Sequence, residues 1–334
     1  MNRRLVKIAG ICIALVTLML AGIYGYVSSN SFMTKAADEG ATIAEDILST
    51  KVDIGLVKVD SLNSLEIQDV AVYDKNDNLI ARVADAKVGF SYLSMLKNSA
   101  AEGVREVRLQ GVEANIYQRA DGSWNFSDLI SEEPSESKFT GKVHVVDGSV
   151  KLVFNGNELA VDDVNADLDF DGYPAINIQG TAKNQGADVR LRGNVGGERQ
   201  TFDVEVQNLE LENYVPLIPN GVIPEDMVKD IAGTVPKFMV SGERVGSELY
   251  YTGQLELRDG TVTILDTKVD NINGLAIFDQ KEAQVFMSAA TSGQQATAKG
   301  KIKLVEGKPI LDLTVASDGF EPSVLIKNIP YQGP

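Results

Sequence analysis

The stretch Phe202-Asp-Val-Glu-Val-Gln207 decides the fold, because its apolar and polar residues alternate strictly. A period of two places the apolar side chains on one face of a β-strand and the polar side chains on the other. The same alternation recurs in residues 189–192, 301–304 and 311–315. One apolar and one solvated face are typical of antiparallel sheets. The sequence therefore predicts a mainly β protein built from antiparallel strands.

Asp-Gly and Asn-Gly pairs punctuate the alternating runs, at Asp147-Gly148, Asn155-Gly156 and Asp259-Gly260. Such pairs are the strongest short-range signal for tight hairpin turns. Glycine is favoured in these turns because it adopts a positive φ without a steric penalty. We therefore expect hairpins at these positions, with glycine at positive φ.

The chain contains an internal repeat with a spacing of about 110 residues. Three short segments recur in the same order: 143–150 as 255–262, 161–165 as 269–273, and 202–206 as 311–315. Ordered recurrence at one spacing is typical of repeat architectures. We expect a first β repeat from 139 to 248 and a second, incomplete one from 249 to 334.

The N-terminal segment has the features of a membrane anchor. Residues 8–27 form a run of 20 residues without a charge, long enough to cross a bilayer core as a helix. Arg3, Arg4 and Lys7 precede it, and the positive-inside rule then keeps the N-terminus in the cytoplasm. A cleaved signal peptide is the alternative, but the segment lacks a clear A-x-A cleavage pattern. We expect 1–30 to be a cytoplasmic tip and a transmembrane anchor.

Residues 31–130 are expected to combine a helix with a β region. The helix is predicted over residues 32–48, where apolar residues recur at steps of three and four. Its other face is acidic, which favours packing on the end of a sheet over lying on a membrane surface. Residues 131–138 are acidic, contain a proline and predict a linker or long loop.

The composition argues against several kinds of chemistry. The chain has 31 Lys+Arg against 47 Asp+Glu, so its net charge of −16 disfavours nucleic acid as a partner. One His and one Cys cannot supply a Cys/His zinc site or a disulfide within the chain. Residues 167–172 begin like a calcium loop, but Ile178 stands where that loop needs a glutamate. We expect no metal, no cofactor and no enzymatic activity.

One segment is more specific than the alternating runs, namely Asp121-Gly-Ser-Trp-Asn-Phe126. Its local interpretation is a hairpin whose aromatic residues fill the apolar face of the sheet. Together with residues 65–74 and 84–90, it resembles the N-terminal region of the AsmA-like and TamB-like envelope proteins, within the superfamily of β-groove, bridge-like lipid transfer proteins. The residues that match the family motif are Asp121, Gly122, Trp124, Asn125 and Phe126.

The resemblance implies a long, curved antiparallel repeat sheet that forms a β-groove, with a capping helix and one transmembrane helix. It implies an inner-membrane protein whose bulk lies in the periplasm and which shields phospholipid acyl chains for transport between membranes or for outer-membrane assembly. The implied partners are phospholipid, the inner membrane and outer-membrane assembly proteins. An anchored β-repeat scaffold that binds protein partners is the alternative, because alternation alone does not separate the two. The residues expected to line the groove are Val143, Val145, Val150, Leu152, Phe154, Phe202, Val204, Val206, Leu255, Leu257, Val262 and Ile264.

Overall fold

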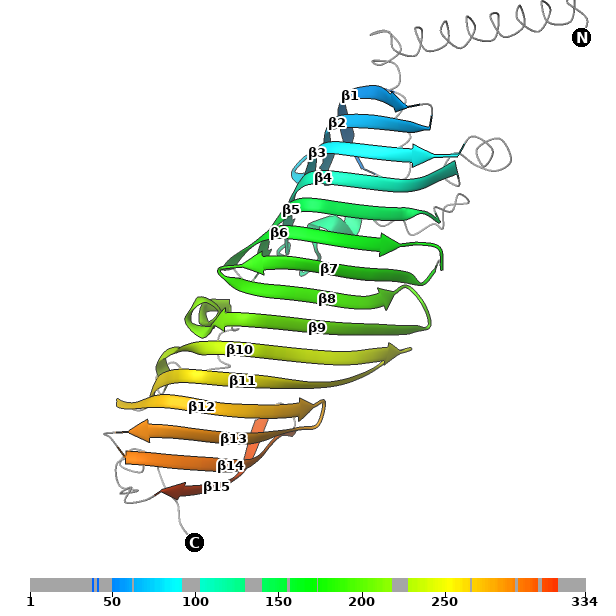
Figure 1. Ribbon diagram of the computed structural model, residues 1–334. Coiled ribbons are helices and arrows are strands. Elements are labelled where there is room, and N and C mark those ends of the chain that lie inside the picture. Colours follow the sequence, from blue (N-terminus) through cyan, green and yellow to red (C-terminus); the bar gives the residue numbers. More distant parts are fainter. Residues whose placement is uncertain are drawn as a thin grey trace, which may run out of the picture. The chain divides into compact units, whose positions relative to one another are not determined.

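The described part of the chain is almost entirely β-structure. The computed structural model describes Asp38, Ala41 and residues 50–61, 63–91, 103–129, 140–154, 157–172, 174–217, 228–264, 266–291, 294–305 and 308–317. The chain divides into two units, Met1–Gly148 and Ser149–Pro334. The hydrogen-bonded order of the strands is their order in the chain, from β1 to β15 (Figure 1).

The first unit is a meander of four strands that continues into a fifth. It contains β1 (Val52–Ser61), β2 (Ser64–Tyr73), β3 (Leu79–Phe90), β4 (Val104–Tyr117) and the 3-10 helix η1 (Asn125–Leu129). Strands β1 to β4 pair antiparallel in sequence order. The buried apolar side chains of this unit are Val52, Val57, Ile80, Val83 and Ala86. Strand β5 (Lys142–Phe154) crosses the boundary between the units.

The second unit continues the same pattern. It contains β6 (Asn157–Asp169), β7 (Ile176–Asn184), β8 (Ala187–Val195), β9 (Arg199–Glu210), the 3-10 helices η2 (Leu211–Asn213) and η3 (Val215–Leu217), β10 (Val228–Val245), β11 (Glu248–Ile264), β12 (Thr267–Asp279), β13 (Glu282–Thr291), β14 (Gln294–Val305) and β15 (Lys308–Ser317). From β6 to β15 each strand pairs antiparallel with the next. The prediction of a mainly β protein with one antiparallel sheet is therefore confirmed.

The predicted helices fall largely outside the described residues. Of the helix expected over residues 32–48, Asp38 and Ala41 are described, and both have helical backbone. The expected membrane span, 8–27, and the expected linker, 131–138, lie outside the described residues. Within the part of the chain that the structure describes, no helix has both the length and the apolar character needed to cross a membrane.

The prediction of hairpin turns at the Asp-Gly pairs is wrong. Asp147-Gly148 lies inside β5, and Asp259-Gly260 lies inside β11. The positive φ belongs to the aspartates, at 55° and 50°, and not to the glycines that follow them. The register between β11 and β12 shifts at Gly260, which marks a β-bulge. Aspartate tolerates the left-handed region because its short polar side chain bonds locally. The connection at 155–156 lies outside the described residues.

The bulge in β11 keeps the apolar residues of that strand on one face. Before the bulge Leu257 pairs with Gly274, and after it Gly260 pairs with Ile272. Leu257 and Val262 are five positions apart, so a regular strand would turn them to opposite faces. The extra residue corrects this alternation, because the bulge lets two residues of β11 oppose one of β12. Strands that bend at a bulge thus still present a continuous apolar face.

The repeat segments share this backbone device. Asp163 in β6 and Asn271 in β12 both have a φ of 51°. Two residues later, the side-chain amide of Asn165 donates to the backbone oxygen of Asp163 at 2.9 Å, and that of Asn273 donates to the oxygen of Asn271 at 2.9 Å. Segments that resemble each other in sequence therefore form the same bulge with the same local hydrogen bond.

Candidate functional site

One face of the second unit carries apolar residues in rows that run across the strands. Residues directly opposite each other in an antiparallel pair lie on the same face of the sheet. The register from β8 to β13 therefore defines one row as Val189, Val206, Phe238, Leu255, Ala276 and Val285. A second row is Leu191, Val204, Val240, Gly253, Phe278 and Ala283. We call this surface the apolar face.

Most side chains of the apolar face are neither fully buried nor free in solvent, although Val285 is buried. Val204, Val206, Phe238 and Leu255 are half-buried, and Leu191 is 42% exposed. The described residues form a single sheet, so no second sheet covers these rows there. A large apolar surface of this kind marks a site for a ligand or a partner, because monomeric proteins rarely leave such surfaces open.

Glycines let aromatic rings lie flat on this face. Phe202 pairs with Gly242, and a Cβ at Gly242 would lie 2.6 Å from the Phe202 ring. Gly253 pairs with Phe278, whose ring occupies the space above the glycine in the same way. The rings of Phe238 and Phe278 stack with centroids 6.2 Å apart. Large residues beside glycines therefore make a level apolar surface.

The twelve residues expected to line a groove all lie in strands β5, β9 and β11, and all are half-buried. Phe202, Val204 and Val206 join Leu255 through the strand register. The rows also contain residues that the sequence did not single out, chiefly Phe238 and Val285. Their signal is weaker because β10 and β13 do not alternate cleanly, and only the register shows which of their residues share a face.

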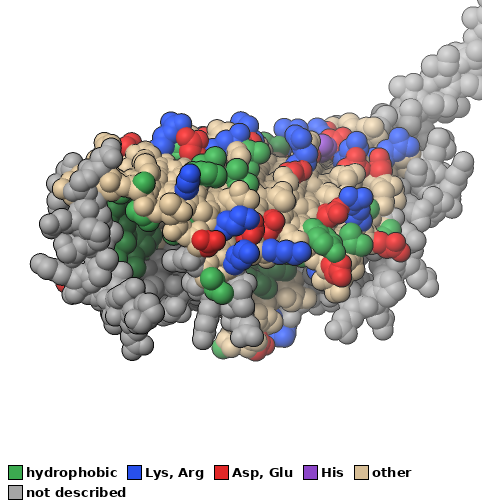
Figure 2. Space-filling model, turned by 90° about the horizontal axis from the view of Figure 1, so that it is seen from below, with side chains coloured by type: hydrophobic (Ala, Val, Ile, Leu, Met, Phe, Trp, Pro, Cys, Tyr) green, Lys and Arg blue, Asp and Glu red, His purple; other side chains and the backbone are tan. Residues whose placement is uncertain are grey.

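The opposite face of the same strands is polar. Glu205 lies 4.0 Å from Arg190 and 3.9 Å from Lys237, through neighbouring strands on either side. Figure 2 shows basic and acidic side chains intermixed over the surface in view, with hydrophobic side chains between them. At one end of β9 to β12 an open cleft of about 700 Å³ includes residues of both faces, among them Phe202 and Asp203. Among the residues that the structure describes, no group of three or more potential ligands is placed to hold a metal ion.

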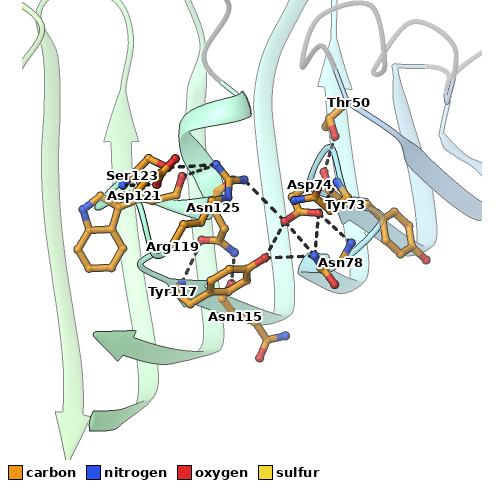
Figure 3. Close-up of polar contacts among 12 residues, drawn as sticks. Thr50, Tyr73, Asp74, Asn78, Asn115, Tyr117, Arg119, Asp121, Ser123 and Asn125 are labelled. Atoms are coloured by element: carbon orange, nitrogen blue, oxygen red, sulfur yellow. Dashed lines mark hydrogen bonds and ion pairs between the residues drawn. The ribbon is translucent and has the colours of Figure 1, made fainter. Parts of the chain in front are cut away.

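A separate polar cluster is buried at the end of β4 in the first unit (Figure 3). The carboxylate of Asp74, 2% exposed, accepts backbone hydrogen bonds from Asn76 at 2.8 Å and Asn78 at 2.9 Å. It also accepts a 2.6 Å hydrogen bond from the hydroxyl of Tyr117, and Arg119 lies 3.7 Å away. Burial acts to raise the pKa of Asp74, but the hydrogen bonds from Tyr117 and the two asparagines outweigh it and hold this pKa well below its usual range. The same bond to Asp74 raises the pKa of Tyr117.

The motif residues 121–126 are hydrogen-bonded to two members of this cluster, Tyr117 and Arg119. Asn125 is fully buried; its side chain accepts from the backbone nitrogen of Tyr117 at 3.1 Å and donates to the backbone oxygen of Asn115 at 2.7 Å. Arg119 donates to the backbone oxygens of Trp124 and Asn125 at 3.3 and 3.2 Å. These bonds fix the turn that follows β4.

The predicted hairpin at this motif is only partly present. Asp121 accepts a 2.9 Å hydrogen bond from the backbone of Ser123, Gly122 has a φ of 85°, and a single bridge joins Gln118 to Trp124. Instead of a second strand, the chain then enters η1. The rings of Trp124 and Phe126 stack at 6.0 Å. The contacts of the motif are therefore structural, and they hold the end of β4 in place.

No family model, curated protein or solved structure matched the chain when compared with it. The likeness to AsmA-like and TamB-like proteins therefore stays a prediction from short motifs, and the apolar face is the feature on which a function can be argued.

Proposed function

We propose that the protein is an envelope protein whose apolar sheet face shields phospholipid acyl chains, for lipid transport between membranes or for outer-membrane assembly. The observation that carries the proposal is the set of mostly half-buried apolar rows running across β8 to β13. The resemblance of the motif residues to the AsmA-like and TamB-like family supports it. Shielding an acyl chain needs no catalytic group, and we propose that the protein is not an enzyme.

The energetics of an acyl chain fit such a surface. Exposing a 16-carbon chain to water costs ~0.8 kcal/mol per CH₂, or about 13 kcal/mol in all. Six strands at ~4.8 Å spacing extend over about 24 Å, and one acyl chain spans half of a ~30 Å bilayer core. One row is therefore long enough to cover a chain, while the charged headgroup remains in water.

The membrane attachment is part of the proposal. We assign residues 8–27 as the anchor in the inner membrane, with the N-terminus in the cytoplasm and the later residues in the periplasm. The segment 32–48 would cap the first end of the sheet. A reporter that works only outside the cytoplasm should be active when it is fused after Asn30. Activity of a reporter that works only inside the cytoplasm, fused at the same position, would contradict this orientation.

A photo-crosslinking residue placed on either face tests lipid contact directly. Leu255 lies on the apolar face, and its neighbour Gln254 lies on the other face, so the two positions form a matched pair. Irradiation of the full chain in membranes should give lipid adducts at position 255 and few at position 254. Protein adducts at 255 without lipid would instead favour the scaffold that binds protein partners.

A further inference from the structure

The polar face of the second unit carries a group of exposed apolar side chains on β12 and β13. Leu275, Ile277 and Phe286 are 36%, 47% and 49% exposed. Leu275 pairs directly with Phe286, while the adjacent pair of Ala276 and Val285 belongs to the apolar face. The three residues therefore lie on the opposite side of the sheet. We call them the outer patch.

The first repeat has polar residues at the same positions. After their matching bulges, Asn165 pairs with Thr181 in one repeat, and Asn273 pairs with Ser288 in the other. Two residues further along, the first repeat pairs Asp167 with Gln179, where the second pairs Leu275 with Phe286.

The next polar-face position differs in the same way. The first repeat has Asp169 opposite Asn177, and the second has Ile277 opposite Gln284. In the first repeat the side chain of Gln179 donates to the carboxylate of Asp167 at 3.0 Å. The fold thus accepts polar residues here, so folding does not explain the apolar residues of the outer patch.

The charges beside the outer patch are arranged with opposite signs at its two ends. Across four strands the register gives the row Glu256, Leu275, Phe286 and Lys299. Glu256 also bonds to Arg258 at 2.7 Å, and within the described part of the chain Lys299 makes no ion pair. A two-fold axis along the strand direction reverses the row. It would place Leu275 over Phe286 of a second copy and Glu256 over its Lys299.

We propose that the outer patch is the centre of a homodimer interface in which two copies of the chain pack face to face. Two sheets that pack in this way lie ~10 Å apart and interdigitate their side chains. A two-fold interface uses the same patch on both subunits and must be self-complementary, as the reversed row is. The apolar face lies on the other side of each sheet, so it stays open in the dimer. This inference does not depend on the proposed lipid function.

The repeat supplies the variant that tests the interface. The change Leu275→Asp with Phe286→Gln installs the residues of the first repeat, which the same backbone already accommodates. We expect the wild-type full chain in detergent micelles to self-associate with concentration in analytical ultracentrifugation. The double variant should raise the dimer dissociation constant about tenfold or more at an unchanged melting temperature. Thr181→Asp, exposed on the same face in the first repeat, is the control and should leave the constant unchanged.

A charge swap tests whether the partner that covers the outer patch is a second copy of the chain. Lys299→Glu should weaken the dimer, and adding Glu256→Lys should restore it, since the two positions face each other across the axis. A wild-type chain that remains monomeric at all concentrations would overturn the proposal, as would a swap that fails to restore association. Patch-dependent binding of the monomeric chain to phosphatidylglycerol vesicles would overturn it in favour of a membrane contact.

Discussion

The side-chain oxygen of Asn273 accepts a hydrogen bond from the backbone nitrogen of Asp259 at 3.1 Å, across two neighbouring strands. The amide nitrogen of the same side chain donates to the backbone oxygen of Asn271 at 2.9 Å. Asp259 and Asn271 both have positive φ, at 50° and 51°. One side chain therefore ties together the two bulges that keep the apolar residues of β11 and β12 on one face.

Removing this tie should destabilise the second unit. Asn273→Ala loses both hydrogen bonds, and we expect the free energy of unfolding to fall by about 1–2 kcal/mol. Asn273→Asp keeps the acceptor for Asp259 but loses the donor to Asn271, so its loss should be smaller. Urea unfolding followed by circular dichroism measures both, and equal stability of all three proteins would contradict the role given to Asn273.

The left-handed backbone at Asp259 predicts an unusual order of substitutions. Asp259→Val places a β-branched residue at positive φ and should cost about 1–2 kcal/mol of stability. Asp259→Gly removes the steric problem and should cost less, although glycine usually weakens a strand. Thermal unfolding of the two variants gives the order; a valine variant as stable as the glycine variant would argue against a strained bulge.

The strands were predictable from sequence wherever one face is apolar and the other polar, as in Phe202 to Gln207. The bulges were not predictable from sequence, because an Asp-Gly pair is compatible both with a tight turn and with a left-handed residue inside a strand. The outer patch escaped prediction for a related reason. Leu275 and Ile277 flank Ala276 in a run that is apolar on both faces, and only pairing with β11 and β13 separates them. The motif of residues 121–126 was singled out from the sequence, but its link to Asp74 through Tyr117 and Arg119 was not predictable, because Asp74 is distant from these residues in sequence.

The Asp74 cluster should make the first unit sensitive to acid. The pKa of Asp74 is lower in the folded chain than the ~3.9 of an unfolded aspartate, so its carboxylate stabilises the fold above about pH 4. That stabilisation is lost as the pH falls below this value. Fluorescence of Trp124, the only tryptophan, should therefore report a falling urea midpoint between about pH 5 and 3.

Two variants check the cause of this acid sensitivity. Asp74→Asn should cost about 2–4 kcal/mol at neutral pH and flatten the dependence on pH. Tyr117→Phe removes the hydroxyl that donates to Asp74 at 2.6 Å, so the pKa of Asp74 in the folded chain should rise toward its unfolded value and the acid-dependent loss of stability should become smaller. An unchanged pH profile in both variants would remove Asp74 as the titrating group.

Asn125 should matter more than the exposed residues of its motif. Asn125→Ala would leave the backbone nitrogen of Tyr117 and the backbone oxygen of Asn115 without their side-chain partner, at a cost of about 2–3 kcal/mol. Ser123→Ala, in the turn itself, should cost less than about 1 kcal/mol. The tryptophan fluorescence midpoint in urea compares the two. A larger loss of stability for Ser123→Ala than for Asn125→Ala would contradict this structural role of Asn125.

The lipid content of a single-residue variant tests the central claim most directly. Val204 lies half-buried on the apolar face, between Leu191 and Val240 in its row, whereas Thr181 is exposed on the other face beside Arg190. Extraction and mass spectrometry of the purified full chain give phospholipid per protein for Val204→Asp and for the control Thr181→Asp. The account predicts that Val204→Asp loses bound phospholipid while circular dichroism still shows β-sheet, because an open face can hydrate the new carboxylate. It also predicts that Thr181→Asp keeps its phospholipid. A wild-type chain that carries no phospholipid would contradict the account. So would a Val204→Asp variant that unfolds, because unfolding is expected when a carboxylate is placed in a dry, closed core.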